Sequence, residues 1–265
     1  MAGKRRIALL VEYDGTAFAG SQAQPARPTV QQAVETAIEA FTGETQRVCF
    51  AGRTDAGVHA LGQVVTLDTR TAHEPVRFRD ALNHFLPEDV AIRVACEASP
   101  DFDPRHNACS RLYRYVIEDG RRRSPLTRRI AWQREGTLDV RPMSEAAALL
   151  PRESRDWAAF AAPAAPGRST VRRLLRCEVN RCGPHRIEIW MEADAFLPHQ
   201  VRRTVGALER VGIGRMTPDE FARLIDQPAG TVGPAAPPQG LTLMAVRYAR
   251  GMVDWDDDED VPPQR

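Results

Sequence analysis

The apolar positions in the first hundred residues alternate between strand-like runs and helical repeats. Residues 6–13 form a β-rich apolar run that ends at a turn. Apolar residues then recur at helical spacing over residues 30–41, after a capping box that begins at Thr29, and again over residues 78–85. Further strands are predicted at residues 46–51, 63–68 and 90–94. The resulting order, β-α-β-β-α-β, is the split βαβ or ferredoxin-like pattern.

A second set of strands and helices follows Phe102. Strands are predicted at residues 112–118, 129–133, 171–179, 186–193 and 241–248, and helices at residues 144–150, 200–211 and 218–225. We therefore expect an α/β (α+β) fold of two ferredoxin-like or RRM-like halves, with mainly antiparallel sheets joined around a central cleft. The expected domains are residues 1–105, residues 106–250, and an acidic, disordered tail over residues 251–265.

The composition is that of an ordinary globular protein, with 43% hydrophobic and 27% charged residues in a chain of 265. No apolar run reaches the roughly 18 residues that a membrane helix needs, and we expect no secretory signal at the N-terminus. The five cysteines form no Cys-x-x-Cys pair and lack histidines at zinc-finger spacing, so we expect no metal site. Scattered cysteines are typical of reduced thiols, and we expect a cytoplasmic protein without a membrane partner.

The net charge of +1 conceals a strong local bias. Residues 103–215 contain 22 arginines against 13 acidic residues, whereas six of the seven residues 254–260 are acidic. Lys4 is the only lysine, and a GC-rich genome would explain this preference for arginine, but it would not explain the clustering. A basic middle segment in a nearly neutral protein predicts a surface that binds a polyanion, with nucleic acid as the leading candidate.

The strongest candidate for chemistry is the segment GRTDAGVHA at residues 52–60, between two predicted strands. It carries one carboxylate, Asp55, flanked by Arg53 and His59. Gly57 permits a positive φ and a close approach of a ligand to the backbone. An Asp in a glycine-bearing turn also serves simply as a turn former, so the segment alone leaves both interpretations open.

Two further segments combine basic and apolar residues. In RLYRY, which ends at Tyr115, strand alternation places Arg111, Tyr113 and Tyr115 on one face, where rings could stack on bases; a tyrosine half-buried at a sheet edge is the alternative. In FLPHQVRR, Arg202 and Arg203 fall early in a predicted helix, where cations oppose the helix dipole. Either arginine could bind a carboxylate or a ligand, or lie on a solvated helix face.

These segments together resemble the TruA family of tRNA pseudouridine synthases. GRTDAGVHA resembles the family's catalytic loop without a gap, and the later motifs occur in the family's order. The resemblance extends from about residue 6 to residue 248 and rests on the segments at residues 13–20, 52–60, 111–115, 195–206 and 237–241.

The resemblance implies an isomerase that converts uridine to pseudouridine at nucleotides 38, 39 and 40 in the anticodon stem-loop of tRNA. It implies a homodimer that uses no cofactor and no metal. Asp55 matches the catalytic aspartate, Tyr113 the tyrosine that packs against the target uracil, and Arg202 the arginine that pairs with the aspartate. Arg53 matches an arginine linked to moving the base out of the stack.

The chain departs from the family pattern at two positions. The family usually has tryptophan where Ser21 stands, and an aromatic residue or histidine where Pro198 stands. Neither position coincides with Asp55, Tyr113 or Arg202. We therefore expect the departures to affect local packing and RNA contacts rather than the chemistry.

Three other functions are compatible with parts of the pattern. A catalytically silent tRNA-binding protein or chaperone would need the basic face but not the intact Asp55, Tyr113 and Arg202. A retaining glycoside hydrolase needs two carboxylates about 5 Å apart, and Asp55 has no evident partner in the sequence. A structural α/β protein could owe its arginine-rich surface to base composition alone, and it would lack the steep salt dependence of RNA binding.

Overall fold

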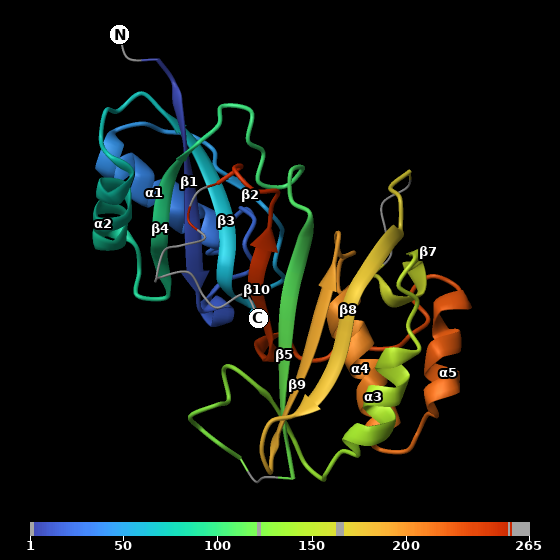
Figure 1. Ribbon diagram of the computed structural model, residues 1–265. Helices are drawn as coiled ribbons and strands as arrows, with labels where there is room; N and C mark the ends of the chain where they lie inside the picture. The colour runs from blue at the N-terminus through green and yellow to red at the C-terminus, as the bar shows by residue number, and fades with distance from the viewer. Residues whose placement is uncertain (1–2, 121–122, 163–166, 254, 256–265) are drawn as a thin grey trace. The chain divides into compact units, whose positions relative to one another are not determined.

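The computed structural model describes residues 3–120, 123–162, 167–253 and 255. The chain divides into two compact units (Figure 1). One contains the chain up to Cys109 and the segment from Leu243 onward, and the other contains Ser110–Thr242. The domain boundaries expected at residues 105 and 250 stay a prediction about folding domains.

The first unit contains two helices and a mostly antiparallel sheet. Its elements are β1 (Arg5–Tyr13), the 3-10 turn η1 (Gly15–Ala17), α1 (Val30–Thr42), β2 (Cys49–Phe50), β3 (His59–Thr69), α2 (Pro75–Phe85), β4 (Val90–Ala98) and β10 (Leu241–Arg247), which begins in the second unit. The strand order is β4-β1-β3-β10, with β2 also paired to β3. The pairs β1–β3, β1–β4 and β2–β3 are antiparallel. The expected element order and the expected mainly antiparallel sheet are thereby confirmed.

Local sequence signals explain the elements that the sequence predicted well. The Thr29 side chain accepts a hydrogen bond from the Gln32 amide at the start of α1, and the helix ends at Gly43. Its buried positions, Val30, Val34, Ala37 and Ile38, follow the predicted helical spacing. Helices α1 and α2 pack together on one face of the sheet (Figure 1).

Two strand boundaries in this unit differ from the sequence prediction. The strand expected at residues 46–51 is reduced to Cys49–Phe50. In contrast, β3 begins at His59, four residues before the predicted start. His59 therefore belongs to a strand rather than to the loop that carries Asp55.

The second unit has a sheet in the order β5-β9-β8-β7, covered by helices (Figure 1). Its elements are β5 (Ser110–Asp119), β6 (Trp132–Arg134), α3 (Val140–Ala148), β7 (Ser154–Asp156), η2 (Ala158–Phe160), β8 (Val171–Arg181), β9 (Arg186–Ala193), α4 (Gln200–Gly212), α5 (Pro218–Ala222), η3 (Arg223–Asp226) and η4 (Pro238–Gly240). The pairs β5–β9, β8–β9 and β7–β8 are antiparallel, whereas β6 pairs with β5 in parallel. Helix α3 packs on β8, α4 and α5.

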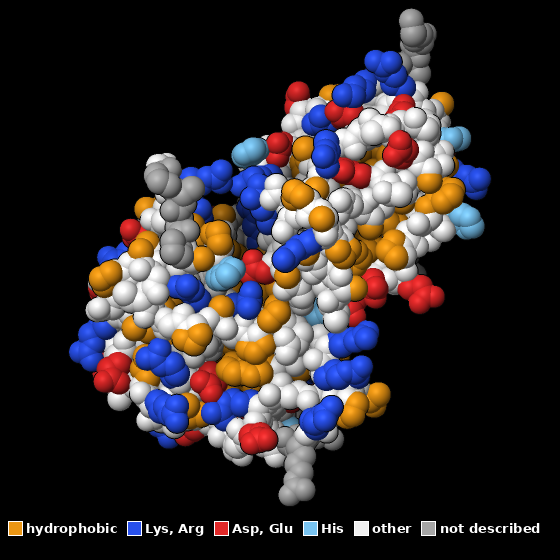
Figure 2. Space-filling view, turned by 180° about the vertical axis from the view of Figure 1, so that it is seen from behind, with side chains coloured by type: hydrophobic (Ala, Val, Ile, Leu, Met, Phe, Trp, Pro, Cys, Tyr) orange, Lys and Arg blue, Asp and Glu red, His pale blue; other side chains and the backbone are white. Residues whose placement is uncertain are grey.

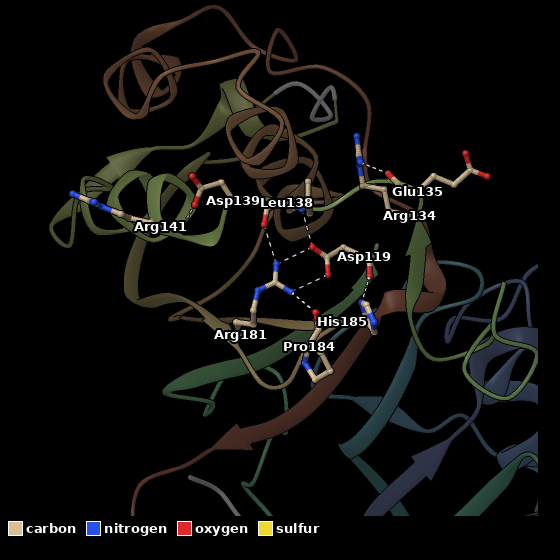
Figure 3. Close-up of polar contacts among 9 residues, drawn as sticks. All are labelled: Asp119, Arg134, Glu135, Leu138, Asp139, Arg141, Arg181, Pro184 and His185. Carbon is tan, nitrogen blue, oxygen red and sulfur yellow. Dashed lines mark hydrogen bonds and ion pairs between the residues drawn. The ribbon is translucent and has the colours of Figure 1, made fainter. Parts of the chain in front are cut away.

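An ion pair fixes the end of β5 in this unit (Figure 3). The Asp119 carboxylate is 0% exposed and accepts hydrogen bonds from Arg181 Nη1 at 2.9 Å and Nη2 at 2.8 Å. It also accepts the backbone N–H of Leu138 at 2.7 Å. Burial alone would raise the pKa of Asp119, but these hydrogen bonds outweigh it and hold the pKa below its usual range.

Most of the expected disordered tail, and two residues of the basic turn at 121–123, lie outside the described residues. Trp255 is described and is only 5% exposed, so this tail residue packs against the fold. Among the described residues, no helix is long and apolar enough to cross a membrane.

Candidate active site

The loop at residues 51–58 carries Asp55 directly after a buried residue and before the exposed Ala56. Thr54 and Val58 are buried, whereas Asp55 is half-buried. The Val58 amide donates to the Asp55 carbonyl oxygen at 3.2 Å, which closes a turn after the carboxylate. Gly57 has φ 76°, the left-handed conformation expected from the sequence.

Buried side chains hold the loop before Asp55. The Tyr13 and Thr54 hydroxyls lie 2.8 Å apart, and Gln63 Nε2 donates to the Gly52 carbonyl at 3.0 Å and to the Tyr13 hydroxyl at 3.4 Å. Burial raises the pKa of Tyr13 to about 12, although hydrogen bonds from Thr54 and Gln63 oppose the rise. Tyr13 therefore stays neutral and adds no negative charge beside the loop.

His59 and Arg53, which flank the aspartate in the sequence, lie in different surroundings. His59 is buried, its Nδ1 accepts the Gly15 amide at 3.1 Å, and the Asp14 carboxylate lies 3.1 Å from the same atom. Its ring therefore fixes the turn after β1. Arg53, in contrast, is exposed.

Tyr113 lies on β5 in the second unit and is 8% exposed. Its ring packs edge-to-face on Phe196, with centroids 5.4 Å apart and an interplanar angle of 85°. Two of the sequence motifs, RLYRY and the segment before α4, are thereby brought together. Tyr115 is fully buried and donates to the Pro237 carbonyl at 2.7 Å, so its ring belongs to the core.

The two arginines at the start of α4 make different contacts. Arg202 Nε donates to the Ala236 carbonyl at 2.8 Å, and the Ala236 amide donates back to the Arg202 carbonyl at 2.9 Å. Arg203 Nη1 instead donates to the carbonyls of Ala161 at 2.9 Å and Gly230 at 3.2 Å. Arg203 thus connects two loops, whereas Arg202 binds the segment that contains Ala236 in both directions.

The four candidate residues are divided between the units. Asp55 and Arg53 belong to the first unit, and Tyr113 and Arg202 belong to the second. Sequence reasoning assigned no role to Gln63 or Ala236, because their contacts join segments far apart in the chain. Ser21 is 1% exposed and its side chain binds the Thr54 amide directly. The only feature of the sequence that drew attention to Ser21 was its departure from the family pattern.

Basic side chains are spread over the surface of the second unit. Its exposed arginines include Arg128, Arg129, Arg168, Arg173 and Arg215. Figure 2 shows Lys and Arg side chains at many separate points of the visible face, with acidic side chains between them. Some of these charges are paired, as in Arg155–Asp226 at 3.0 Å. A continuous polyanion-binding face stays a prediction.

Comparison with known proteins gives consistent similarities over nearly the whole chain. A family described as tRNA pseudouridine synthase matches residues 9–107 and 154–249. The chain is 45% identical over 258 residues to a tRNA pseudouridine synthase A of Chloroflexus aurantiacus, covering 95% of this chain and 91% of that protein. It is 43% identical over 246 residues to the tRNA pseudouridine synthase A of Geobacter sulfurreducens, covering 92% and 100%.

Proposed function

The chain belongs to the TruA family of tRNA pseudouridine synthases, and on this premise we propose that Asp55 is its catalytic carboxylate. The chain is an isomerase that acts on tRNA. We further propose that its targets are uridines 38, 39 and 40 of the anticodon stem-loop, as the family resemblance implies. The observation that carries the assignment is the half-buried Asp55, which lies in a loop held by buried hydrogen bonds on both sides.

The reaction needs an ionised carboxylate and a nucleotide that has left the base stack. Moving the base out of the stack costs about a few kcal/mol, and least near a loop. The bond between ribose C1′ and uracil N1 then breaks, the base turns, and C1′ joins C5. The proton on C5 is lost and N1 gains a proton, so the net reaction is an isomerisation without any redox partner.

Asp55 could serve this reaction by three routes. It could attack C1′ as the glycosidic bond breaks, add to the uracil ring, or remove a ribose proton to leave a glycal. Each route requires the carboxylate form in a partly dry site, where burial favours the protonated acid. We propose that Arg202 supplies the compensating charge, because a guanidinium stays protonated and forms a planar fork with carboxylates.

Tyr113 and Arg53 are proposed to bind the flipped nucleotide. The Tyr113 ring, held against Phe196, would stack on the target uracil. The exposed Arg53 would occupy the space that the base leaves and contact its phosphate. Because these residues belong to different units, the proposal requires both units to act on one nucleotide.

The finer architecture and the setting are also proposals. We propose two ferredoxin-like halves around a central cleft, because the chain order β1-α1-β2-β3-α2-β4 is repeated as β5-α3-β8-β9-α4-β10 when the short β6, β7 and α5 are left out. We propose a homodimer from the family resemblance. A cytoplasmic location is supported by the five free cysteines.

Pseudouridine mapping of tRNA from a deletion strain tests this function. We expect pseudouridine to disappear at nucleotides among 38, 39 and 40 and to return when the wild-type gene is restored. Unchanged modification in the deletion strain, together with purified protein that binds tRNA without modifying it, would favour the catalytically silent tRNA-binding protein instead.

A further inference from the structure

We infer that Ser21 is a positioning residue that fixes the backbone leading into Asp55, an inference that rests on the proposed function. Ser21 lies between η1 and α1, 33 positions before Thr54, and is 1% exposed. Its Oγ accepts a hydrogen bond from the Thr54 amide, with the two atoms 2.9 Å apart. Its own amide donates to the Thr54 carbonyl at 3.1 Å.

These two hydrogen bonds fix two successive peptide planes. The Thr54 amide belongs to the peptide between Arg53 and Thr54, and the Thr54 carbonyl belongs to the peptide between Thr54 and Asp55. Because a peptide unit is planar, holding one polar atom on each side of the Thr54 Cα restricts both of its backbone dihedrals. The direction in which the chain enters Asp55 therefore depends on Ser21.

Ser21 is itself held in place by the start of α1. Its carbonyl accepts the Gln31 amide at 3.0 Å, so one residue connects the helix to the loop. The preceding Gly20 has φ 104°, and a Cβ there would lie 2.8 Å from the Thr54 carbonyl oxygen. A side chain at position 20 would therefore prevent the close approach of residues 20–21 to Thr54 on which both hydrogen bonds depend.

Other contacts hold the loop independently of Ser21. The Thr54 hydroxyl is bound by Tyr13 at 2.8 Å, and Gln63 binds the Gly52 carbonyl at 3.0 Å. After Asp55, the Val58 amide closes a turn on the Asp55 carbonyl. Removing the Ser21 hydroxyl would leave the buried Thr54 amide without its acceptor, so the loop backbone would shift although its other contacts remain.

A shift of this kind should slow the chemical step more than it weakens tRNA binding. A displacement near 1 Å of a catalytic group costs about 100-fold in rate. For Ser21→Ala we expect a single-turnover rate about 10- to 100-fold below wild type, with the Kd for a tRNA transcript within about 2-fold. Hydrogen exchange of a peptide spanning residues 51–58 should be faster than in the wild type.

Thr69→Val is the matched control at the opposite end of β3. Thr69 is also 1% exposed, and its hydroxyl accepts the Thr71 amide at 3.1 Å and donates to Glu44 Oε2 at 2.7 Å. The substitution also removes a buried hydroxyl that accepts a backbone amide. It should lower the Tm while leaving the single-turnover rate within about 2-fold of wild type, since the bond lies far from the loop.

The inference is overturned if Ser21→Ala and Thr69→Val have single-turnover rates within 2-fold of each other, or if exchange of the 51–58 peptide is unchanged. If Ser21→Ala does not fold, Ser21→Cys tests the same contact, because the cysteine side chain is of similar size but its sulfur is a weak acceptor for the Thr54 amide. A wild-type rate for Ser21→Cys overturns the inference. An active Asp55→Asn enzyme would instead refute the proposed function. A failure of the Ser21 test with Asp55→Asn inactive refutes only the positioning role.

Discussion

Replacing Asp119 with asparagine should destabilise the second unit more than any exposed charge substitution. The carboxylate is 0% exposed and accepts three hydrogen bonds, two of them from Arg181 in a bidentate arrangement (Figure 3). Removing one member of a buried ion pair costs about 3–5 kcal/mol. Because the Arg181 side chain is 29% exposed and can rehydrate, we expect the lower end of that range, about 3 kcal/mol.

Thermal unfolding followed by circular dichroism measures this loss. A loss of about 3 kcal/mol lowers the Tm by roughly 6–12 °C in a chain of this size. Glu145→Gln is the control, since its partner Arg141 is 87% exposed and the pair should contribute under about 1 kcal/mol. Equal Tm values for the two variants would refute the assignment of Asp119 as a stabilising buried charge.

The same pair predicts how stability depends on pH. The pKa of Asp119 in the folded protein lies below its usual range, although burial alone would raise it, because Arg181 and Leu138 donate to the carboxylate. Because the pKa of Asp119 is lower in the folded protein than in the unfolded chain, the ion pair stabilises the fold fully above the pKa of the unfolded chain, near 4. This stabilisation is lost as the pH falls through the pKa of the folded protein. The Tm difference between wild type and Asp119→Asn should therefore shrink below about pH 4.

Three further predictions concern the site and the tail. Tyr113→Phe should change tRNA affinity by much less than the roughly 1–3 kcal/mol expected for Tyr113→Ala, because stacking needs the ring; equal losses in filter binding would show that the hydroxyl dominates. Arg202→Met should lower the single-turnover rate by more than it weakens tRNA binding, because the proposed guanidinium fork favours the ionised carboxylate that the reaction needs. Weaker tRNA binding with an unchanged single-turnover rate would make Arg202 a phosphate-binding residue instead. Truncation after Trp255 should leave the single-turnover rate and the Tm unchanged, whereas truncation after Gly251 should lower the Tm because it removes the buried Trp255 side chain. Identical Tm values for the two truncated proteins would show that Trp255 contributes nothing to stability.

The elements that the sequence predicted best are those whose signals are local. Helix α1 begins after Thr29 and ends at Gly43 as expected, because capping and helical spacing act within a few residues. The short β7 at Ser154–Asp156 was missed, because three exposed residues carry no periodic signal. The strand expected beside β5 was placed three residues too early, and its parallel pairing at Trp132–Arg134 depends on a chain path that periodicity does not specify.

In the candidate site too, local features could be predicted from the sequence and long-range contacts could not. The motif around Asp55 was recognisable because its residues are contiguous, and Gly57 adopts the positive φ expected there. The contact of Ser21 with Thr54 joins residues 33 positions apart, and no spacing rule relates them. Residue patterning alone left Arg202 and Arg203 open, and only the family resemblance selected Arg202. The carbonyl partners of both arginines lie in segments far from α4 along the chain, which no spacing rule could predict.

The catalytic role of Asp55 is tested most directly by single-turnover conversion of a tRNA transcript with excess Asp55→Asn enzyme. Asparagine keeps the size of the side chain and its hydrogen-bonding oxygen but removes the charge that every proposed route requires. We predict no detectable pseudouridine, while the Kd for the transcript stays within a few-fold of wild type, because we expect arginines elsewhere in the chain to bind the phosphates. Pseudouridine formation by Asp55→Asn at more than a small fraction of the wild-type rate would contradict the account.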